Sequence, residues 1–184
     1  YMELSSWGAD AVRIGIGGGS ICSTRIQTGH GVPTFQSILD CSSVDGATIV
    51  ADGGIKNSGD IVKALAAGAD FVMLGSMLAG TDATPGEVLN TSENNKYKVY
   101  RGMASPEAQV AWRGNARSLE GVSTTVQYKG SIEELLDKVA RNIKSGLSYS
   151  GARSIRELQI RARFIKQSNA GQIESSTHIL RNEK

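Results

Sequence analysis

The sequence has few of the residues that build disulfide frameworks and metal sites. Its 184 residues include two cysteines, two histidines and three prolines, and aromatic residues make up 5%. Because Cys22 and Cys41 are the only cysteines, no disulfide framework is expected, and a reducing cytosol is the predicted compartment. No cluster of histidine and cysteine has metal-ligand spacing, so we expect no transition-metal site and assign His30 no catalytic role.

An excess of one charge and a long apolar run are also missing. Twenty basic residues face 18 acidic ones, and the resulting net charge of +2 predicts neither a nucleic-acid nor a membrane partner. No apolar run reaches the roughly 18 residues of a membrane span, and no signal peptide is visible. The length allows one domain with its own core. Since the sequence opens on Tyr1 in a helix-like pattern, we interpret it as a piece of a longer protein.

Glycine is plentiful, and many of the 22 glycines follow short apolar runs. The apolar runs predict strands, and the segments between them predict helices, so the first half is an α/β series. Strands without polar alternation predict a parallel sheet buried on both faces, either doubly wound or a (β/α)8 barrel. Both folds bind ligands at the carboxyl ends of strands, where these glycines lie. Expected strands are 11–16, 47–51 and 69–74; expected helices are 2–8, 33–40 and 58–67, the last capped by Ser58 and Gly68.

After residue 80 the alternation of strand and helix stops. Three strands cannot close a barrel, so a barrel would be present only as its second half, with an apolar sheet edge left open. The sequence further predicts a hairpin at 86–102 with Glu93-Asn94-Asn95 in its turn and a mobile loop at 104–121. Two helices are expected next, at 131–144 with a capping box of Ser131 and Glu134, and at 153–164. The polar tail at 167–184 is expected to be frayed or to depend on a partner for its structure.

Cys22 follows the first glycine run, in the stretch Gly17-Gly18-Gly19-Ser20-Ile21-Cys22-Ser23-Thr24-Arg25. A thiol nucleophile needs access and a lowered pKa, and both nearby amides and a cation such as Arg25 favour them. The alternative is an inert buried thiol beside a flexible turn, because cysteine is among the most buried residue types. The residues alone leave both interpretations open for Cys22, whereas Cys41, without a supporting motif, is interpreted as a buried thiol.

Two further glycine turns close the next strands, at Asp52-Gly53-Gly54 and Gly75-Ser76. Backbone N–H groups of such turns are donors for an anion such as a phosphate. Asp52 is placed to accept two hydrogen bonds from ribose hydroxyls, or alternatively to cap a turn. Three glycine turns at successive strand ends therefore favour a nucleotide site over a solitary thiol.

Longer motifs then carry a resemblance to the inosine-monophosphate dehydrogenase / guanosine-monophosphate reductase family, from about residue 10 to 165. They are GGGSICSTR, GVPTFQSI, ADGGIKNSGDIVKALAAGAD, FVMLGSMLAGT, PGE, YKVYRGMAS, EG and YKGS. The resemblance implies a (β/α)8 TIM barrel and a homotetramer. Residues 1–184 would then be the C-terminal half of the barrel domain, with a flap at about 86–130 and a tail at about 167–184.

The resemblance also implies a role for each matching residue. Cys22 is the thiolate that attacks C2 of a purine mononucleotide, GMP or IMP, while Thr24 and Glu120 handle protons. Substrate-binding residues are Ser20, Gly54, Gly75, Ser76 and Tyr100 at the 5′-phosphate, Asp52 with Gly53 at the ribose turn, and Gly102 and Met103 at the base. The cofactor, NADPH or NAD, meets Tyr149, Ser150, Gly151 and Ala152 across a subunit boundary. The carbonyl groups of Gly17, Gly19 and Cys22 hold a monovalent cation, potassium, in a loop that Gly18 loosens by replacing the usual proline.

The resemblance is compatible with two activities, that of the dehydrogenase and that of the reductase. The dehydrogenase hydrolyses the thioimidate with an Arg-Tyr pair on a long flap, and no such pair occurs between Met103 and Glu120, which favours the reductase. The tail at 170–179 and the motifs YRGM and YKG resemble the dehydrogenase instead. A nucleotide-binding module without hydride transfer is the rival from another class, and the 184 residues alone are expected to be inactive.

Overall fold

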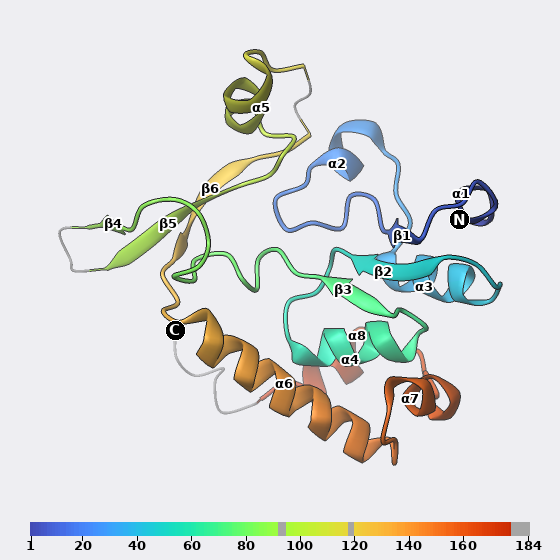
Figure 1. Cartoon of the computed structure of the whole chain (residues 1–184). Helices are drawn as coiled ribbons and strands as arrows, with labels where there is room; N and C mark the ends of the chain where they lie inside the picture. Colours follow the sequence, from blue (N-terminus) through green and yellow to red (C-terminus); the bar gives the residue numbers. More distant parts are fainter. Residues whose placement is uncertain (92–94, 118–119, 178–184) are drawn as a thin grey trace.

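The structure, a computed structural model, describes residues 1–91, 95–117 and 120–177. Its two sheets lie apart in Figure 1, a parallel sheet flanked by helices and an antiparallel sheet built from the second half of the chain. The parallel sheet contains β1 (Ala11–Ile14), β2 (Thr48–Asp52) and β3 (Phe71–Met73); the antiparallel sheet contains β4 (Leu89–Asn90), β5 (Lys96–Arg101) and β6 (Ser123–Gln127).

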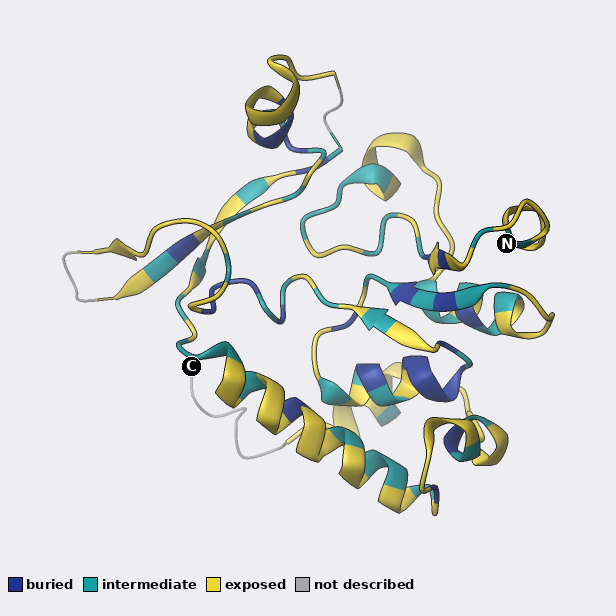
Figure 2. Ribbon diagram, in the orientation of Figure 1, coloured by how far each residue is buried: buried dark blue, intermediate teal, exposed yellow. Residues whose placement is uncertain are grey.

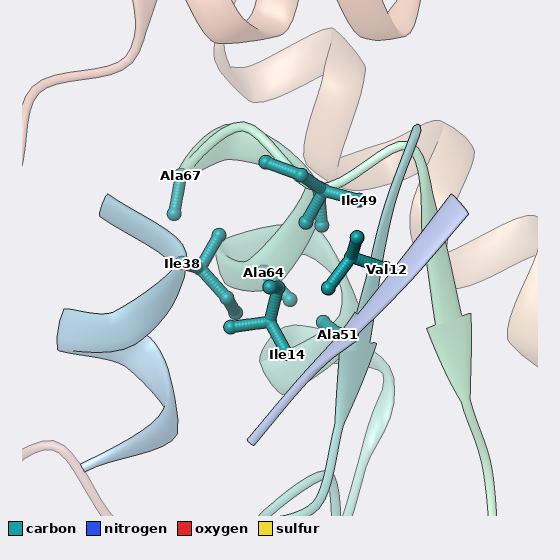
Figure 3. Close-up of a cluster of buried hydrophobic side chains, with 8 residues drawn as sticks. Val12, Ile14, Ile38, Ile49, Ala51, Ala64 and Ala67 are labelled. Atoms are coloured by element: carbon teal, nitrogen blue, oxygen red, sulfur yellow. The ribbon is translucent and has the colours of Figure 1, made fainter. Parts of the chain in front are cut away.

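The parallel sheet confirms the α/β series predicted from the glycines and apolar runs. β2 lies between β1 and β3, with Ala11 opposite Thr48 and Val50 opposite Phe71. The connecting helices α3 (Thr34–Ser42) and α4 (Ser58–Ala66) pack on the sheet. Their apolar side chains close a core around the strands, as Figure 3 shows: Val12, Ile14, Ile38, Ile49, Ala51, Ala64 and Ala67.

The predicted burial of both sheet faces is wrong for this chain. Residues of β1 and β2 alternate between buried and more accessible, because the helices of the described residues cover one face (Figure 2). On β3, Phe71 is 63% exposed and Met73 is 41% exposed. β3 pairs only with β2 among the described residues, so the parallel sheet has an open edge there, and its uncovered face carries exposed apolar side chains.

A second core lies beneath α4, where α6 (Ile132–Tyr149) and α7 (Ile155–Arg161) pack against it. Its buried members include Ile61, Leu65, Val139 and Leu158. Ser131 caps α6 as predicted, accepting hydrogen bonds from the amides of Glu133 and Glu134, and the helix continues beyond the expected end to Tyr149.

The caps of α4 differ from the prediction. Asn57, not Ser58, is the N-cap, because its side chain accepts the amide of Asp60 at 3.0 Å. At the other end the C-cap is Ala67, and Gly68 follows it with a positive φ of 113°.

The antiparallel sheet is larger than the hairpin that the sequence predicts. β4 and β5 form that hairpin, although Glu93 and Asn94 of its expected turn lie outside the described residues. β6 adds a third strand, with Tyr97 opposite Gln127. The predicted mobile loop instead contains α5 (Pro106–Arg113), capped by the Ser105 hydroxyl and opened by a proline.

Three short helices complete the described chain: α1 (Met2–Ser6), α2 (Thr24–Thr28) and α8 (Asn169–Glu174). α8 shows that the first part of the tail is helical rather than frayed, while His178 and the residues after it lie outside the described ranges. Among the described residues, no helix combines the length and apolar character needed to cross a membrane.

Candidate active site

The loop that carries Cys22 is held by backbone hydrogen bonds. The Cys22 amide donates to the carbonyl oxygen of Gly19 at 3.1 Å, which closes a turn after the glycine run. On the other side, the Ser23 amide donates to the Glu120 carbonyl at 2.8 Å, and the Val122 amide donates to the Ile21 carbonyl at 3.1 Å. Cys22 therefore sits in a short bridge with the chain that enters β6, so main-chain hydrogen bonds help to fix its position.

A hydrogen-bonded chain joins the three predicted catalytic side chains. The Cys22 thiol donates to Thr24 Oγ1 at 3.2 Å, and the Thr24 hydroxyl donates to Glu120 Oε2 at 2.7 Å. Thr24 is the first residue of α2, so its side chain is fixed by the start of that helix. A thiol connected in this way to a carboxylate has a route for losing its proton, which is the arrangement that nucleophilic catalysis requires.

Arg25 binds the backbone of the loop that carries Cys22. Its guanidinium donates to the carbonyl oxygens of Ile16 at 3.2 Å and Val32 at 2.7 Å. Its aliphatic part lies against Gly17, where an added Cβ would be 2.7 Å from Arg25 Cγ. Arg25 therefore closes the loop between the glycine run and residue 32, and its hydrogen bonds go to the loop backbone rather than to the thiol.

Two of the glycine turns meet through their main chains. A Cβ on Gly18 would lie 2.7 Å from Thr34 Oγ1 and 3.2 Å from Gly53 Cα. A Cβ on Gly15, whose φ is +127°, would overlap the carbonyl oxygen of Asp52. Gly18, where the resemblance predicts a looser loop, is thus closely packed, and side chains at these positions would push the two turns apart.

Polar groups from three segments gather where the resemblance places the phosphate. Ser20 Oγ and Tyr100 Oη are 3.5 Å apart, and a Cβ on Gly75 would be 2.9 Å from Tyr100 Oη. Gly54 has a φ of +80° and nothing within 4 Å of its missing side chain, so the turn after β2 is open to solvent. The carbonyl group of Ser76 accepts a hydrogen bond from Lys129 at 2.6 Å, a contact that sequence reasoning missed.

A cavity of about 380 Å³ adjoins the thiol, a volume within the usual range for small-molecule sites. Asp52 forms an ion pair with Arg13, with 3.0 Å between Asp52 Oδ2 and Arg13 Nε. The sequence contained a signal for Arg13, a charged residue within an otherwise apolar strand. Predicted site residues that line the cavity are Gly17, Gly19, Cys22, Asp52, Tyr100, Gly102, Met103 and Glu120.

The predicted cofactor stretch lies at the end of α6, outside that cavity. Tyr149 is 95% exposed, Ser150 is the C-cap, and Gly151 has a positive φ of 63°. Ala152, however, is buried in the second core, so its side chain packs inside this chain. Of these four residues, Tyr149 presents the side chain best placed to meet a molecule bound outside this chain.

A parallel sheet with glycine turns and a cysteine at the carboxyl ends of its strands is the arrangement of α/β proteins that bind ligands there. The sequence matches the IMP dehydrogenase / GMP reductase domain over residues 1–178. The chain therefore belongs to this family of oxidoreductases.

Individual relatives carry both family names. Inosine-5′-monophosphate dehydrogenase of Nitrosopumilus maritimus is 46% identical over 96% of this chain and 40% of that protein. GMP reductase of Leishmania major is 45% identical over 96% of this chain and 38% of that protein. A crystal structure of a GMP reductase variant from Trypanosoma brucei with guanosine 5′-monophosphate superimposes with a TM-score of 0.90 at 44% identity, covering 96% of this chain and 38% of that one. The chain thus spans about two fifths of the length of the relatives that it matches.

Proposed function

We propose that the protein is a purine-mononucleotide oxidoreductase, and that this chain forms the C-terminal half of its catalytic (β/α)8 barrel. The chain from Cys22 through Thr24 to Glu120 is the observation that carries this proposal. A relative crystallised with guanosine 5′-monophosphate supports a purine mononucleotide as the ligand. The exposed inner face of the parallel sheet supports a missing half, because its apolar residues lack a cover among the described residues.

The geometry supports covalent catalysis by the thiol. The Cys22 proton passes to Thr24 as the Thr24 proton passes to Glu120, which leaves a thiolate beside the cavity. The thiolate attacks C2 of the purine, and the protonated Glu120 returns a proton through Thr24 to the group that leaves C2. Asp52 accepts hydrogen bonds from the ribose hydroxyls, while Ser20, Gly54, Gly75, Ser76 and Tyr100 surround the 5′-phosphate.

GMP is the preferred substrate, with ammonia as the leaving group. A hydride from the nicotinamide would then add to C2 as the C2–S bond breaks, which releases IMP and returns Cys22 to the thiolate. Thr24 and Glu120 are sufficient to protonate the departing amino group, whereas hydrolysis needs a base for water. The Arg-Tyr pair that would supply such a base is missing from the sequence between Met103 and Glu120. IMP dehydrogenase is the second candidate, favoured by the tail at 170–179 and by relatives of that name with equal identity.

The nicotinamide cofactor supplies the hydride chemistry, and the protein supplies its position. Tyr149 fits a role at a subunit boundary, because its exposed ring can stack on a base of the cofactor in a homotetramer. Because the Ala152 side chain is buried, this residue can contact the cofactor only through its main-chain atoms. The carbonyl groups of Gly17, Gly19 and Cys22 suit potassium, since neutral backbone oxygens hold that ion elsewhere, and the Gly19 carbonyl keeps one lone pair after accepting the Cys22 amide.

A paired assay with the full-length protein tests the proposal. GMP with NADPH, and IMP with NAD, are each followed by the near-ultraviolet absorbance of reduced nicotinamide. Loss of absorbance with GMP supports the reductase, whereas a gain with IMP assigns the dehydrogenase. Nucleotide binding without either change in absorbance would favour the non-catalytic nucleotide-binding module. A Cys22→Ser variant that retains most of the wild-type turnover would overturn the covalent mechanism.

A further inference from the structure

Lys98 is a buried lysine whose ammonium group binds a loop backbone. The residue lies on β5 and is 3% exposed. Its Nζ donates to the carbonyl oxygens of Thr81 at 3.0 Å, Asp82 at 3.3 Å and Thr84 at 2.5 Å. An ammonium group has three protons, so these contacts use all of them. A buried charge is tolerated only when it is satisfied in this way, which makes the loop and the lysine dependent on each other.

Lys129 binds the other end of the same loop. It follows β6, and its Nζ donates to the carbonyl oxygens of Ser76 at 2.6 Å and Met77 at 3.2 Å. Its main-chain amide also donates to the Gly80 carbonyl at 2.8 Å. Although much of the residue is exposed, burial around the ammonium lowers the pKa of Lys129 below its ordinary value of 10.5. We call residues 75–84 the turn segment; Lys98 of β5 and Lys129, which follows β6, both hold it through its carbonyl groups.

The turn segment begins with Gly75-Ser76, the turn assigned above to the 5′-phosphate. Because side chains two residues apart on a strand share a face, Lys98 and Tyr100 both face the turn segment from β5. Tyr100 Oη reaches Gly75 and lies 3.5 Å from Ser20 Oγ. Since a trans peptide directs its N–H and C=O to opposite sides, fixing the carbonyl of Ser76 on Lys129 also fixes the direction of the next amide.

The same sheet reaches the reacting centre at its other end. The chain enters β6 through Glu120, Gly121 and Val122, which are bound to the Cys22 loop by main-chain hydrogen bonds. The chain leaves β6 toward Lys129. One strand therefore links the carboxylate that receives the thiol proton to the lysine that holds the phosphate turn, as the path of β6 in Figure 1 illustrates.

We propose that Lys98 and Lys129 are positioning residues that fix the Gly75-Ser76 turn on the antiparallel sheet, so that phosphate binding sets the distance between the nucleotide and the Thr24–Glu120 pair. Lys98 does not serve as a phosphate ligand in this arrangement, because all three of its ammonium protons are directed at carbonyl oxygens. Two of the Lys129 ammonium protons are directed at carbonyl oxygens in the same way. The inference rests on the proposed function for the identity of the phosphate, but the holding of the turn segment does not depend on it.

The test compares Lys129→Met and Lys98→Met in the full-length protein with Lys96→Met, a matched control on the exposed start of β5. Titration calorimetry in a Cys22→Ala background measures the dissociation constants of GMP and of guanosine, which lacks the phosphate. We expect Lys129→Met to weaken GMP binding by about tenfold or more, because it removes two hydrogen bonds from a charged donor that hold the turn. Guanosine binding should stay within about twofold, and Lys129→Arg should recover most of the loss.

Hydrogen exchange without nucleotide gives a readout independent of the proposed function. Amides of the turn segment should exchange about tenfold faster in Lys129→Met, with the parallel sheet unchanged. Equal loss of GMP and guanosine affinity, or unchanged exchange in a folded Lys129→Met protein, would overturn the inference. If the Lys98→Met protein does not fold, the Lys129→Met protein tests the inference on its own, because Lys129 is exposed. If the wild-type protein binds neither GMP nor IMP, the proposed function is refuted. The hydrogen-exchange result then still tests whether Lys129 holds the turn segment.

Discussion

Replacing Thr24 with valine tests the proton route directly. Valine has nearly the same shape but lacks the hydroxyl that lies 3.2 Å from the Cys22 thiol and 2.7 Å from Glu120 Oε2. A hydrogen bond to a charged group contributes about 1.5–3 kcal/mol. If this contribution is made in the transition state, each ~1.4 kcal/mol lowers the rate tenfold, so kcat should fall about 10- to 150-fold.

Two measurements separate this effect from misfolding. The rate of nucleotide-dependent nicotinamide turnover reports the whole reaction, and the rate of Cys22 alkylation by iodoacetamide reports formation of the thiolate. Both should fall in Thr24→Val and recover largely in Thr24→Ser, which keeps the hydroxyl. Thr28→Val is the matched control, because Thr28 lies one turn later on α2 and its hydroxyl donates to the Thr24 carbonyl at 2.8 Å. A Thr24→Val protein with at least half of the wild-type kcat and alkylation rate would refute the proton route.

Three further predictions concern the scaffold of the site. Leu158→Ala, at a side chain 1% exposed in the second core, should lower the free energy of unfolding by about 2–5 kcal/mol in urea titrations, whereas Leu136→Ala, at an exposed position, should change it far less. Gly15→Ala should destabilise the chain more than Gly8→Ala in thermal unfolding, because both have positive φ but only Gly15 would collide with the Asp52 carbonyl. Glu107 has a pKa below 4.5, owing to its own amide and then to the Ser123 hydroxyl. Its stabilisation is present above the unfolded pKa and is lost as pH falls through the folded value, so Glu107→Gln should flatten the loss of stability below about pH 4.5; an unchanged acid limb would contradict this.

The first half of the fold follows from local signals in the sequence. Apolar runs, helix caps and glycine turns act within a few residues of one another, so the strands, α3 and α4 are predictable from them. α5 was missed although Ser105 and Pro106 are ordinary start signals, because residues 104–121 have mixed polarity and no long apolar periodicity. β6 was missed because its polar residues are stabilised by pairing with β5, a contact that the sequence alone does not indicate.

The site divides in the same way. The cysteine and the three glycine turns are visible as short motifs, whereas Glu120 is 96 positions from Thr24 and was linked to it by family resemblance. In the sequence, Lys98 and Lys129 look like ordinary charged residues in a polar segment. Their contacts with carbonyl groups arise only when the antiparallel sheet meets the turn segment, so composition and periodicity contain no trace of them.

The main-chain hydrogen bonds around Glu120 also bear on how this protein can change during evolution. The Gly102 amide donates to the Val122 carbonyl at 3.2 Å, and the Ser23 amide donates to the Glu120 carbonyl at 2.8 Å. Main-chain atoms, which every amino acid except proline can supply, therefore anchor both ends of the segment between Met103 and Glu120. We therefore expect changes on the exposed face of α5 to leave the distance between the acid and the thiol unaltered. Under the proposed mechanism, an exchangeable segment beside Cys22 would allow a change in what meets C2 while the covalent step is kept.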